Sequence, residues 1–440
     1  MPAATDHAHD HAADPRCRPQ PAHKGVPAEP YDIERVREDF PILKRLVHER
    51  PGRLGKPLVY LDNAASAQKP RAVIDAMVRC MELEYSNVHR GVHYLSQQTT
   101  DAYEAVRGKI ACFLNAPSRD NIVITRNATE AINLVAATWG RRFLERGDEI
   151  VLSVLEHHAN IVPWQLLQAE KGFEIKVVPC DERGVLDLDA YRDLLGPRTK
   201  LVAMTHGSNV VGTVTPAAEI AAIAHQRDIP VLFDGSQTAV HMPVDVQAIG
   251  ADFYVLTGHK LYGPTGIGAL YGRLNLLHQM PPYQGGGDMI SSVSFSGTTF
   301  RPPPYRFEAG TPPIIEGIGL AAAIDYMEAL GRANIQAHEQ TLLERATAGL
   351  EKIEGVRIIG TAPGKAAIVS FVMDGIHPHD VGMLADQMGV ALRVGRHCAE
   401  PLLQRFGLEA TCRASFGLYN TVAEADALVE AVLAVKEFFR

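Results

Sequence analysis

Short apolar runs alternate with amphipathic stretches along most of the chain. Each run has the length of a strand and is bounded by turn-forming residues, as expected for strands that are buried on both faces. The runs cover residues 58–62, 121–125, 149–153, 173–179, 199–206, 229–234 and 251–257. Strands separated by helices predict an α/β fold, in which a largely parallel sheet is covered on both faces.

The pattern differs at the two ends of the chain. Residues 1–30 are rich in His, Pro, Ala and Asp and have no apolar periodicity, so we expect a disordered extension. Order is expected to begin near Tyr31, where residues 32–43 predict a short helix that ends before Pro41. Beyond residue 314, helical patterns alternate with strands at 366–373 and 390–395, which indicates a smaller α/β domain.

A chain of 440 residues favours two domains. After the extension, we expect residues 31–49 to pack with the small domain, 50–305 to form the large domain, and 306–440 to form the small C-terminal domain. Residues 280–313 gather prolines, glycines and serines, and so long a stretch without periodicity is usually functional.

Composition excludes several classes of function. The net charge is -8, from 43 basic and 51 acidic residues, so no nucleic-acid partner is expected. No apolar window is long enough to span a membrane. The six cysteines are scattered, and the N-terminal residues have neither the apolar core of a secretory signal nor the serines of a transit peptide. We therefore expect a cytoplasmic location with reduced thiols. The histidines at 7, 9 and 11 could bind a metal, but a solvated tail is the favoured interpretation, and no metal site is predicted.

Two charged residues follow neighbouring apolar runs. Asp234 ends one run, and Lys260 comes just after the next. A carboxylate at the end of a strand could cap a helix, and most lysines are solvated surface charges. The spacing also fits a lysine that binds a pyridoxal cofactor covalently, with the carboxylate paired to the pyridinium nitrogen.

A phosphate site is indicated by residues 124–139, which read as strand, turn and amphipathic helix. Ala128 and Thr129 would lie at the helix N-terminus, where free N–H groups and the helix dipole favour an anion. The alternative is that Thr129 only caps the helix.

Several long motifs resemble those of cysteine desulfurases, in particular the SUF-type branch, whose members also act as selenocysteine lyases. They lie at residues 61–70, 87–96, 126–136, 156–165, 234–237, 257–271, 306–313, 396–402 and 412–421. The resemblance extends from about residue 31 to the C-terminus. It implies the type I fold of pyridoxal 5'-phosphate enzymes, a homodimer, and transfer of sulfur from L-cysteine to an acceptor protein of the SUF system for iron-sulfur cluster assembly.

The resemblance also implies a role for each matching residue. Lys260 would hold the cofactor as a Schiff base, Asp234 would pair with the ring nitrogen, and Gln237 would bond the phenolic oxygen. The phosphate would be bound by Ala128, Thr129, Thr257 and His259, with Thr311 reaching in from a second subunit. Asn209 and Arg413 would bind the substrate carboxylate. His157 would stack on the ring and relay protons, and the neighbouring His158 is the competing candidate for that position.

Cys398 would be the thiol that accepts sulfur. A single cysteine is most often a small buried apolar residue, but Cys398 follows Arg396 and His397, and we expect this electropositive setting to favour the thiolate. Cys412 is expected to be structural. Two positions depart from the usual family pattern: Arg396 replaces a histidine, and Ser236 replaces an alanine that would lie beside the ring.

Three other functions are alternatives. A selenocysteine lyase or aminotransferase of the same fold is the main alternative, although Cys398 argues against simple transamination. A catalytically silent scaffold is disfavoured because Asp234, Lys260, Cys398 and Arg413 are all present. A nucleotide-binding protein is disfavoured because residues 263–268 lack the spacing of a phosphate-binding loop.

Overall fold

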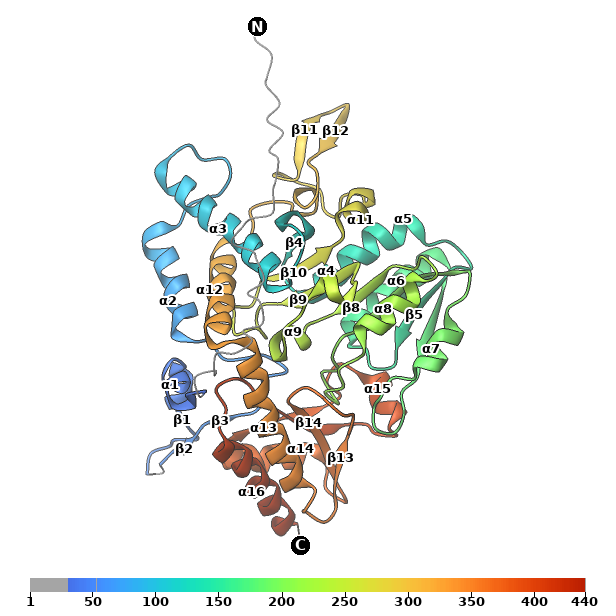
Figure 1. Ribbon diagram of the computed structural model, residues 1–440. Coiled ribbons are helices and arrows are strands. Elements are labelled where there is room, and N and C mark those ends of the chain that lie inside the picture. The colour runs from blue at the N-terminus through green and yellow to red at the C-terminus, as the bar shows by residue number, and fades with distance from the viewer. Residues whose placement is uncertain (1–30, 53, 440) are drawn as a thin grey trace, which may run out of the picture.

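The computed structural model describes residues 31–52 and 54–439 (Figure 1). The expected N-terminal extension and its histidines lie outside the described residues. Within the described part, no helix is both long enough and apolar enough to cross a membrane. The described part also contains no group of three or more His, Cys, Asp or Glu side chains that could hold a metal ion.

The large domain is built on a seven-stranded sheet in the order β4-β10-β9-β8-β7-β5-β6. Five of the strands, β6, β5, β7, β8 and β9, run parallel, whereas β10 pairs antiparallel with both β4 and β9. Their bounds are β4 (Ile122–Thr125), β5 (Glu149–Ser153), β6 (Glu174–Val178), β7 (Thr199–Thr205), β8 (Val231–Asp234), β9 (Phe253–Thr257) and β10 (Gly268–Gly272). The largely parallel α/β sheet is therefore confirmed, and β10 is an addition that the apolar pattern did not predict.

Helices cover both faces of this sheet (Figure 1). Alternate residues of β7 belong to different apolar clusters: Val202 and Met204 pack on one side, and Leu201 and Ala203 on the other. This alternation is the period of two that a strand imposes on its side chains. The helices of this region are α2 (Arg71–Arg79), α3 (Tyr94–Phe113), α4 (Ala128–Val135), α5 (Arg141–Phe143), α6 (Val162–Lys171), α7 (Leu188–Leu194), α8 (Ala217–His225), α9 (Thr238–His241), α10 (Val246–Ile249), α11 (Leu274–Gln279) and α12 (Ile314–Leu330).

The C-terminal part contains a separate antiparallel sheet in the order β13-β14-β17-β16. Its strands are β13 (Val356–Ile359), β14 (Ile368–Met373), β16 (Arg393–Gly395) and β17 (Thr411–Ser415). Its helices are α13 (Arg332–Leu350), α14 (Pro378–Gln387), α15 (Glu400–Arg405) and α16 (Val422–Phe438). A third apolar cluster, distinct from the two around the large sheet, fills the space between this sheet and helices α13, α14 and α16. The smaller α/β unit expected from the sequence is thus present.

The N-terminal segment joins this C-terminal unit. Helix α1 (Ile33–Glu38) begins after Tyr31, whose hydroxyl donates to the carbonyl of Leu418, and Arg37 donates to the carbonyl of Tyr419. Strand β3 (Val59–Tyr60) pairs in parallel with β15 (Val390–Ala391). The apolar run at 58–62 was expected in the large sheet from its pattern. It belongs instead with the C-terminal part. Helix α12 was expected in the small C-terminal domain. It packs instead against α2 and α3 of the large domain.

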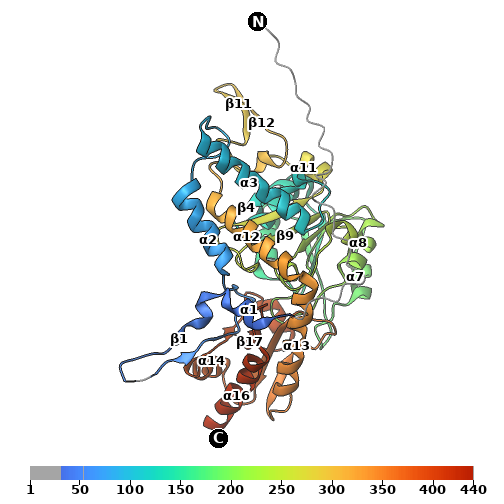
Figure 2. The same cartoon turned by 60° about the vertical axis from the view of Figure 1, so that its left-hand side comes forward.

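Two hairpins extend from the body (Figures 1 and 2). One joins β1 (Leu46–Val47) to β2 (Lys56–Pro57), and the other joins β11 (Ile290–Ser294) to β12 (Gly297–Phe300). The second hairpin lies in the Pro-, Gly- and Ser-rich stretch, where the sequence predicted no regular element. Its tip exposes the ring of Phe295 completely.

Candidate active site

The expected catalytic pair lies on neighbouring strands. Asp234 is the last residue of β8, and Lys260 comes three residues after the end of β9. The two strands are parallel, with Asp234 opposite Val255, so both residues reach the same edge of the sheet. They line one pocket of about 260 Å³ together with residues from both domains. Ligands of open α/β sheets bind at this carboxyl edge of the strands.

Asp234 is buried, and its carboxylate is oriented by the next turn. Its Oδ1 accepts hydrogen bonds from the backbone N–H of Ser236 at 3.0 Å and from the Ser236 hydroxyl at 2.6 Å. The helix that follows, α9, has no side-chain cap, so the alternative role of Asp234 as a helix cap is wrong. Gln237 donates to the carbonyl of Ala64 and also lines the pocket.

The amine of Lys260 has an unusual proton affinity. Burial lowers its pKa to about 8, and the repulsion of Arg413 acts in the same direction, although Asp234 opposes the shift. A lysine with this pKa presents much more neutral amine near pH 7 than a surface lysine does. The neutral amine is the form that attacks a carbonyl and that accepts a proton.

One end of the pocket is suited to an anion. Helix α4 begins there, and Asn127 caps it by accepting a hydrogen bond from the N–H of Glu130. The alternative role of Thr129 as the cap is therefore wrong, and Thr129 lines the pocket with Ala128. The hydroxyl of Thr257 is buried and has no hydrogen-bond partner among the described residues. His259 lies beside it, and burial lowers its pKa to about 4, so its ring is neutral at pH 7.

The two adjacent histidines have different environments. His157 lines the pocket, whereas His158 does not. Burial, followed by the positive charge of Lys260, lowers the pKa of His157 to about 4. Its Nδ1 accepts the backbone N–H of Ala159 at 3.0 Å, so its proton is on Nε2. This placement favours His157 over His158 as the residue that stacks on the cofactor.

A buried carboxyl group supports the loop that carries His157. Glu156 is fully buried and accepts hydrogen bonds from Ser153, from the backbone N–H of Thr205, and from Asn160. Burial raises the pKa of Glu156 to about 7. Because Thr205 lies opposite Asp234 in the sheet, this network fixes the His157 loop to the strand next to β8.

Arg413 is buried at the other end of the pocket, and burial lowers its pKa. Its Nη1 donates to the carbonyl of Asn209 at 2.9 Å, and its Nη2 donates to Asp62 at 2.9 Å. Its Nε–H has no hydrogen-bond partner among the described residues. A buried guanidinium with an unpaired N–H is a suitable donor to a substrate carboxylate.

Cys398 lies at the mouth of the pocket, where it lines the cavity and is also exposed at the surface. It stands between β16 and α15, as expected. One expected source of positive charge is absent, because burial lowers the pKa of His397 to about 3 and makes this ring neutral. The other, Arg396, forms an ion pair with Glu400.

Lys260 and Arg413 also interact electrostatically with Cys398. Cys412, the other cysteine considered, is completely buried, and burial raises its pKa to about 12. Of the remaining cysteines in the described part, Cys80 and Cys180 are free and buried.

The described chain does not bring Thr311 to the pocket, since the residue is exposed and does not line it. Two further residues at the pocket were not indicated by the sequence. Asp62 binds Arg413, and Arg393 lines the pocket with its guanidinium 4.0 Å from Asp62. Asp62 lies inside one of the long motifs, but only the fold shows its partner.

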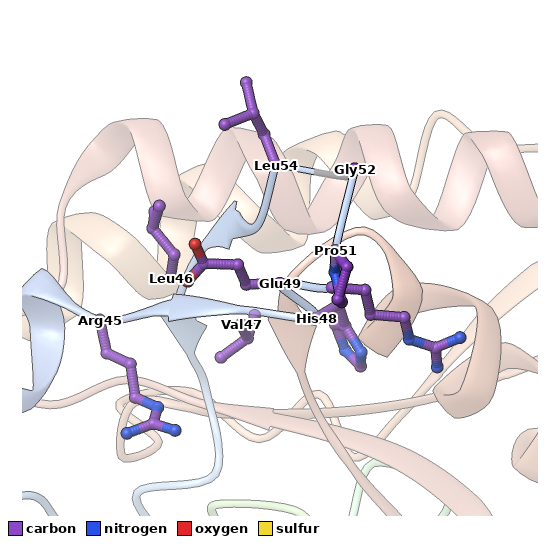
Figure 3. A pocket seen from close by; sticks show the side chains of 9 residues that line it. Arg45, Leu46, Val47, His48, Glu49, Pro51, Gly52 and Leu54 are labelled. Carbon is purple, nitrogen blue, oxygen red and sulfur yellow. The ribbon is translucent and has the colours of Figure 1, made fainter.

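A larger hollow of about 930 Å³ lies on the first hairpin (Figure 3). All of its lining residues come from 45–54, and Leu54 stands out into solvent with 86% of its surface exposed. Because no catalytic group from another element reaches it, this hollow is not a candidate active site.

The chain is similar to a family model, to curated proteins and to solved structures. The family model described as "Aminotransferase class-V" matches residues 59–428. A probable cysteine desulfurase from Xylella fastidiosa is 51% identical over 92% of this chain and 96% of its own length. A cysteine desulfurase from Synechococcus elongatus is 50% identical over 91% of this chain. The crystal structure of the Escherichia coli cysteine desulfurase CsdA matches with a TM-score of 0.86 and 40% identity, covering 93% of this chain and all of that one.

The chain belongs to the class-V aminotransferase family, whose members have the type I fold of pyridoxal phosphate enzymes. Within that family, its relatives place it among the cysteine desulfurases. Some relatives are longer, and the chain spans 63% of the Synechococcus protein and 59% of a probable cysteine desulfurase from Mycolicibacterium paratuberculosis.

Pyridoxal phosphate is the cofactor of this family and of this chain. The pocket fits it on structural grounds. The unpaired hydroxyl of Thr257 and the N-terminus of α4 provide donors for a phosphate, and Lys260 provides an amine of low pKa. Asp234 is a carboxylate that could pair with a pyridinium nitrogen.

Proposed function

We propose that this chain is a cysteine desulfurase, which converts L-cysteine into L-alanine and leaves the sulfur as a persulfide on Cys398. One observation carries the proposal. An exposed thiol lies at the mouth of a pocket that also contains Lys260, Asp234 and Arg413. An aminotransferase needs no such thiol, whereas removal of sulfur requires an acceptor for it.

The chain's own residues bind and orient the reactants. Asp234 would keep the cofactor ring nitrogen protonated, and Gln237 would donate to its phenolic oxygen. His157 would restrict the ring from one face, and the phosphate would accept hydrogen bonds from Thr129, Thr257 and His259. Asn209 and the Nε edge of Arg413 bind the substrate carboxylate. The bound cofactor supplies an electron sink for charge that develops on the substrate.

Sulfur transfer needs an attack at sulfur and proton transfers at two carbons. Lys260, as a neutral amine, takes the proton from the substrate Cα. The thiolate of Cys398 attacks the sulfur, so that an S–S bond forms and the substrate C–S bond breaks. The electron pair of that bond stays on Cβ, which takes up a proton, and Cα regains the proton held by Lys260 to give alanine. No external oxidant or reductant is required.

The proposal is tested by incubating the purified protein with L-cysteine and measuring alanine and protein persulfide. We expect both products in equal amount in the first turnover, with the persulfide on Cys398 by alkylation and mass spectrometry. Pyruvate instead of alanine, or persulfide on another cysteine, would contradict the proposal. L-selenocysteine binds through the same groups, so running it in parallel establishes which of the two substrates turns over faster.

We also propose that the protein acts as a homodimer. Large apolar side chains are exposed near the start of α3 and on the second hairpin, including Val92, Tyr94 and Phe295. Burial of such side chains between subunits would stabilise a dimer. It would also bring Thr311, which is exposed in one chain, to the phosphate site of the other. Sedimentation analysis and a Thr311→Ala variant with weaker cofactor retention test this.

The persulfide is proposed to pass to an acceptor protein of the SUF system for iron-sulfur cluster assembly. The exposure of Cys398 supports direct contact with such a protein. The proposed location is the cytoplasm, where a reducing environment preserves a catalytic thiol.

A further inference from the structure

The turn that carries Cys398 is hydrogen-bonded to the loop that carries His157 and His158. The backbone N–H of His158 donates to the carbonyl of Cys398 at 2.7 Å. The backbone N–H of Glu400 donates to the Nε2 atom of the His158 ring at 3.2 Å. On the other side of the turn, the amide of Asn209 donates to the carbonyl of His397 at 2.7 Å. Three contacts from the large domain thus hold a turn of the C-terminal part.

The backbone of this turn is strained. His397 and Cys398 have φ values of 52° and 55°, so two consecutive residues with side chains lie in the left-handed region. Residues with a Cβ are disfavoured in this region, and the conformation persists only where surrounding contacts enforce it. The contacts of His158 and Asn209 therefore maintain the conformation that places the thiol at the pocket mouth.

The ring of His158 acts as an acceptor. A nitrogen that accepts an N–H bond uses its lone pair, so this contact requires Nε2 to be without a proton. About a third of the His158 side chain is exposed, and His158 does not line the pocket. The carboxylate of Glu400 lies 3.7 Å from Nε2 and is held away by its ion pair with Arg396. The unusual arginine at 396 thus pairs with the residue whose backbone binds the ring.

We propose that His158 is a positioning residue for Cys398. It acts through the unprotonated Nε2 of its ring, which holds the 396–400 turn in the strained conformation from which the thiol faces the pocket. Without this bond, the turn relaxes, and the thiol becomes more accessible to solvent and less well aimed at the substrate sulfur. The inference rests on the proposed desulfurase function and adds a residue that does not touch the reacting atoms.

The test compares His158→Gln with His158→Asn in the cofactor-loaded protein. A glutamine amide reaches the position of Nε2 and can accept the Glu400 N–H, whereas an asparagine amide reaches only the position of Nδ1. One readout is the rate at which iodoacetamide alkylates Cys398, followed by mass spectrometry. The other is the rate of persulfide formation in a single turnover with L-cysteine.

We expect His158→Asn to be alkylated roughly five- to tenfold faster and to form persulfide slower by a similar factor, which is the effect of one ordinary hydrogen bond. His158→Gln should stay within about threefold of the wild type in both readouts. The cofactor absorption band should be the same in all three proteins. His278→Asn serves as a matched control, since His278 is an exposed histidine on α11 of the large domain and does not line the pocket.

Three outcomes would overturn the proposal: equal alkylation rates in His158→Asn and the wild type, a glutamine variant as impaired as the asparagine variant, or loss of cofactor from either variant. The last result would mean that His158 supports the cofactor and not the turn. Absence of persulfide in the wild type would refute the desulfurase function itself. The alkylation rates would still test the hydrogen bond between His158 and the backbone of Glu400, so the two failures are distinguishable.

Discussion

The carboxylate of Asp62 accepts a hydrogen bond from Nη2 of Arg413 at 2.9 Å, across 351 positions of sequence. The same guanidinium donates to the carbonyl of Asn209, so two of its three nitrogens are fixed and the planar group cannot rotate. Its Nε–H has no hydrogen-bond partner among the described residues and is available to a ligand. Asp62 therefore orients the group that we propose binds the substrate carboxylate.

This geometry makes the Arg413→Lys substitution informative. Lysine keeps the charge but loses the fork that binds Asp62, Asn209 and a carboxylate at once. We expect KM for L-cysteine to rise about tenfold or more, with a smaller change in kcat, because one charge-assisted hydrogen bond contributes about 1.5–3 kcal/mol. Steady-state alanine formation measures both constants. Arg405→Lys is the control, since Arg405 binds Cys180 and Glu182 outside the pocket. An unchanged KM in Arg413→Lys would exclude the assigned role.

Ser236 gives this chain a contact that the alanine usual at this position cannot make. Its hydroxyl donates to Asp234 at 2.6 Å, in addition to its backbone N–H. In Ser236→Ala the carboxylate loses one donor and should hold a proton on the cofactor ring more strongly. We expect the pH titration of the cofactor absorption band to move upward by up to about one unit, equivalent to one hydrogen bond. Ser208→Ala, at a buried serine outside the pocket lining, should leave the titration in place.

The lowered pKa of Lys260 predicts how cofactor loading depends on pH. The amine attacks only when neutral, and burial brings its pKa down to about 8 from the ordinary 10.5. Loading of the cofactor-free protein should therefore accelerate as pH rises towards 8 and level off above it, instead of rising to pH 10. Stopped-flow absorbance at a series of pH values measures this.

Lys365 offers a matched control for that experiment. Burial lowers its pKa to about 8 as well, but it donates to the carbonyl of Gly360 outside the active site. Lys365→Arg should load with the wild-type pH profile, whereas Lys260→Arg should not bind the cofactor covalently. A wild-type rate that still rises tenfold between pH 9 and 10 would contradict the shift at Lys260.

The sequence predicted the site well where each group lies at a strand end or inside a long motif. Asp234 and Lys260 could be paired because each follows an apolar run, and neighbouring parallel strands end at one edge. Strand β10 was missed because the glycines of residues 266–272 resemble a loop. Gly268 is required there for packing, since a Cβ would come 2.7 Å from the Cα of Asn127 at the phosphate end of the pocket.

Contacts between distant segments could not be predicted in the same way. The neutral state of His397 depends on its burial against Thr411, and the ion pair of Arg396 depends on how α15 begins. Neither effect has a signature in local residue order. The sequence therefore indicated only the adjacent residues as positive neighbours of Cys398, although Lys260 and Arg413 share the pocket with it.

Cys398 and Cys412 give the most direct comparison of a reactive and a structural thiol. Cys398 is exposed at the pocket mouth, whereas Cys412 is completely buried in β17, with its Sγ 3.5 Å from the carbonyl of Pro378. We expect Cys398→Ser to bind L-cysteine but to accumulate no persulfide, because a hydroxyl is a far weaker nucleophile than a thiol at neutral pH. Alkylation and mass spectrometry of the single-turnover products measure the persulfide.

Cys412→Ser should show the opposite behaviour. Burial raises the pKa of Cys412 to about 12, so its thiolate is absent at pH 7 and its loss should leave the first turnover intact. The buried hydroxyl would instead destabilise the protein by roughly 1–3 kcal/mol, measurable by urea unfolding.

In the wild type, the persulfide stays on Cys398 until another thiol removes it. Addition of a thiol-bearing acceptor protein should therefore raise multiple-turnover alanine formation and leave the first turnover unchanged. Persulfide on Cys412, or a fully active Cys398→Ser enzyme, would refute the mechanism.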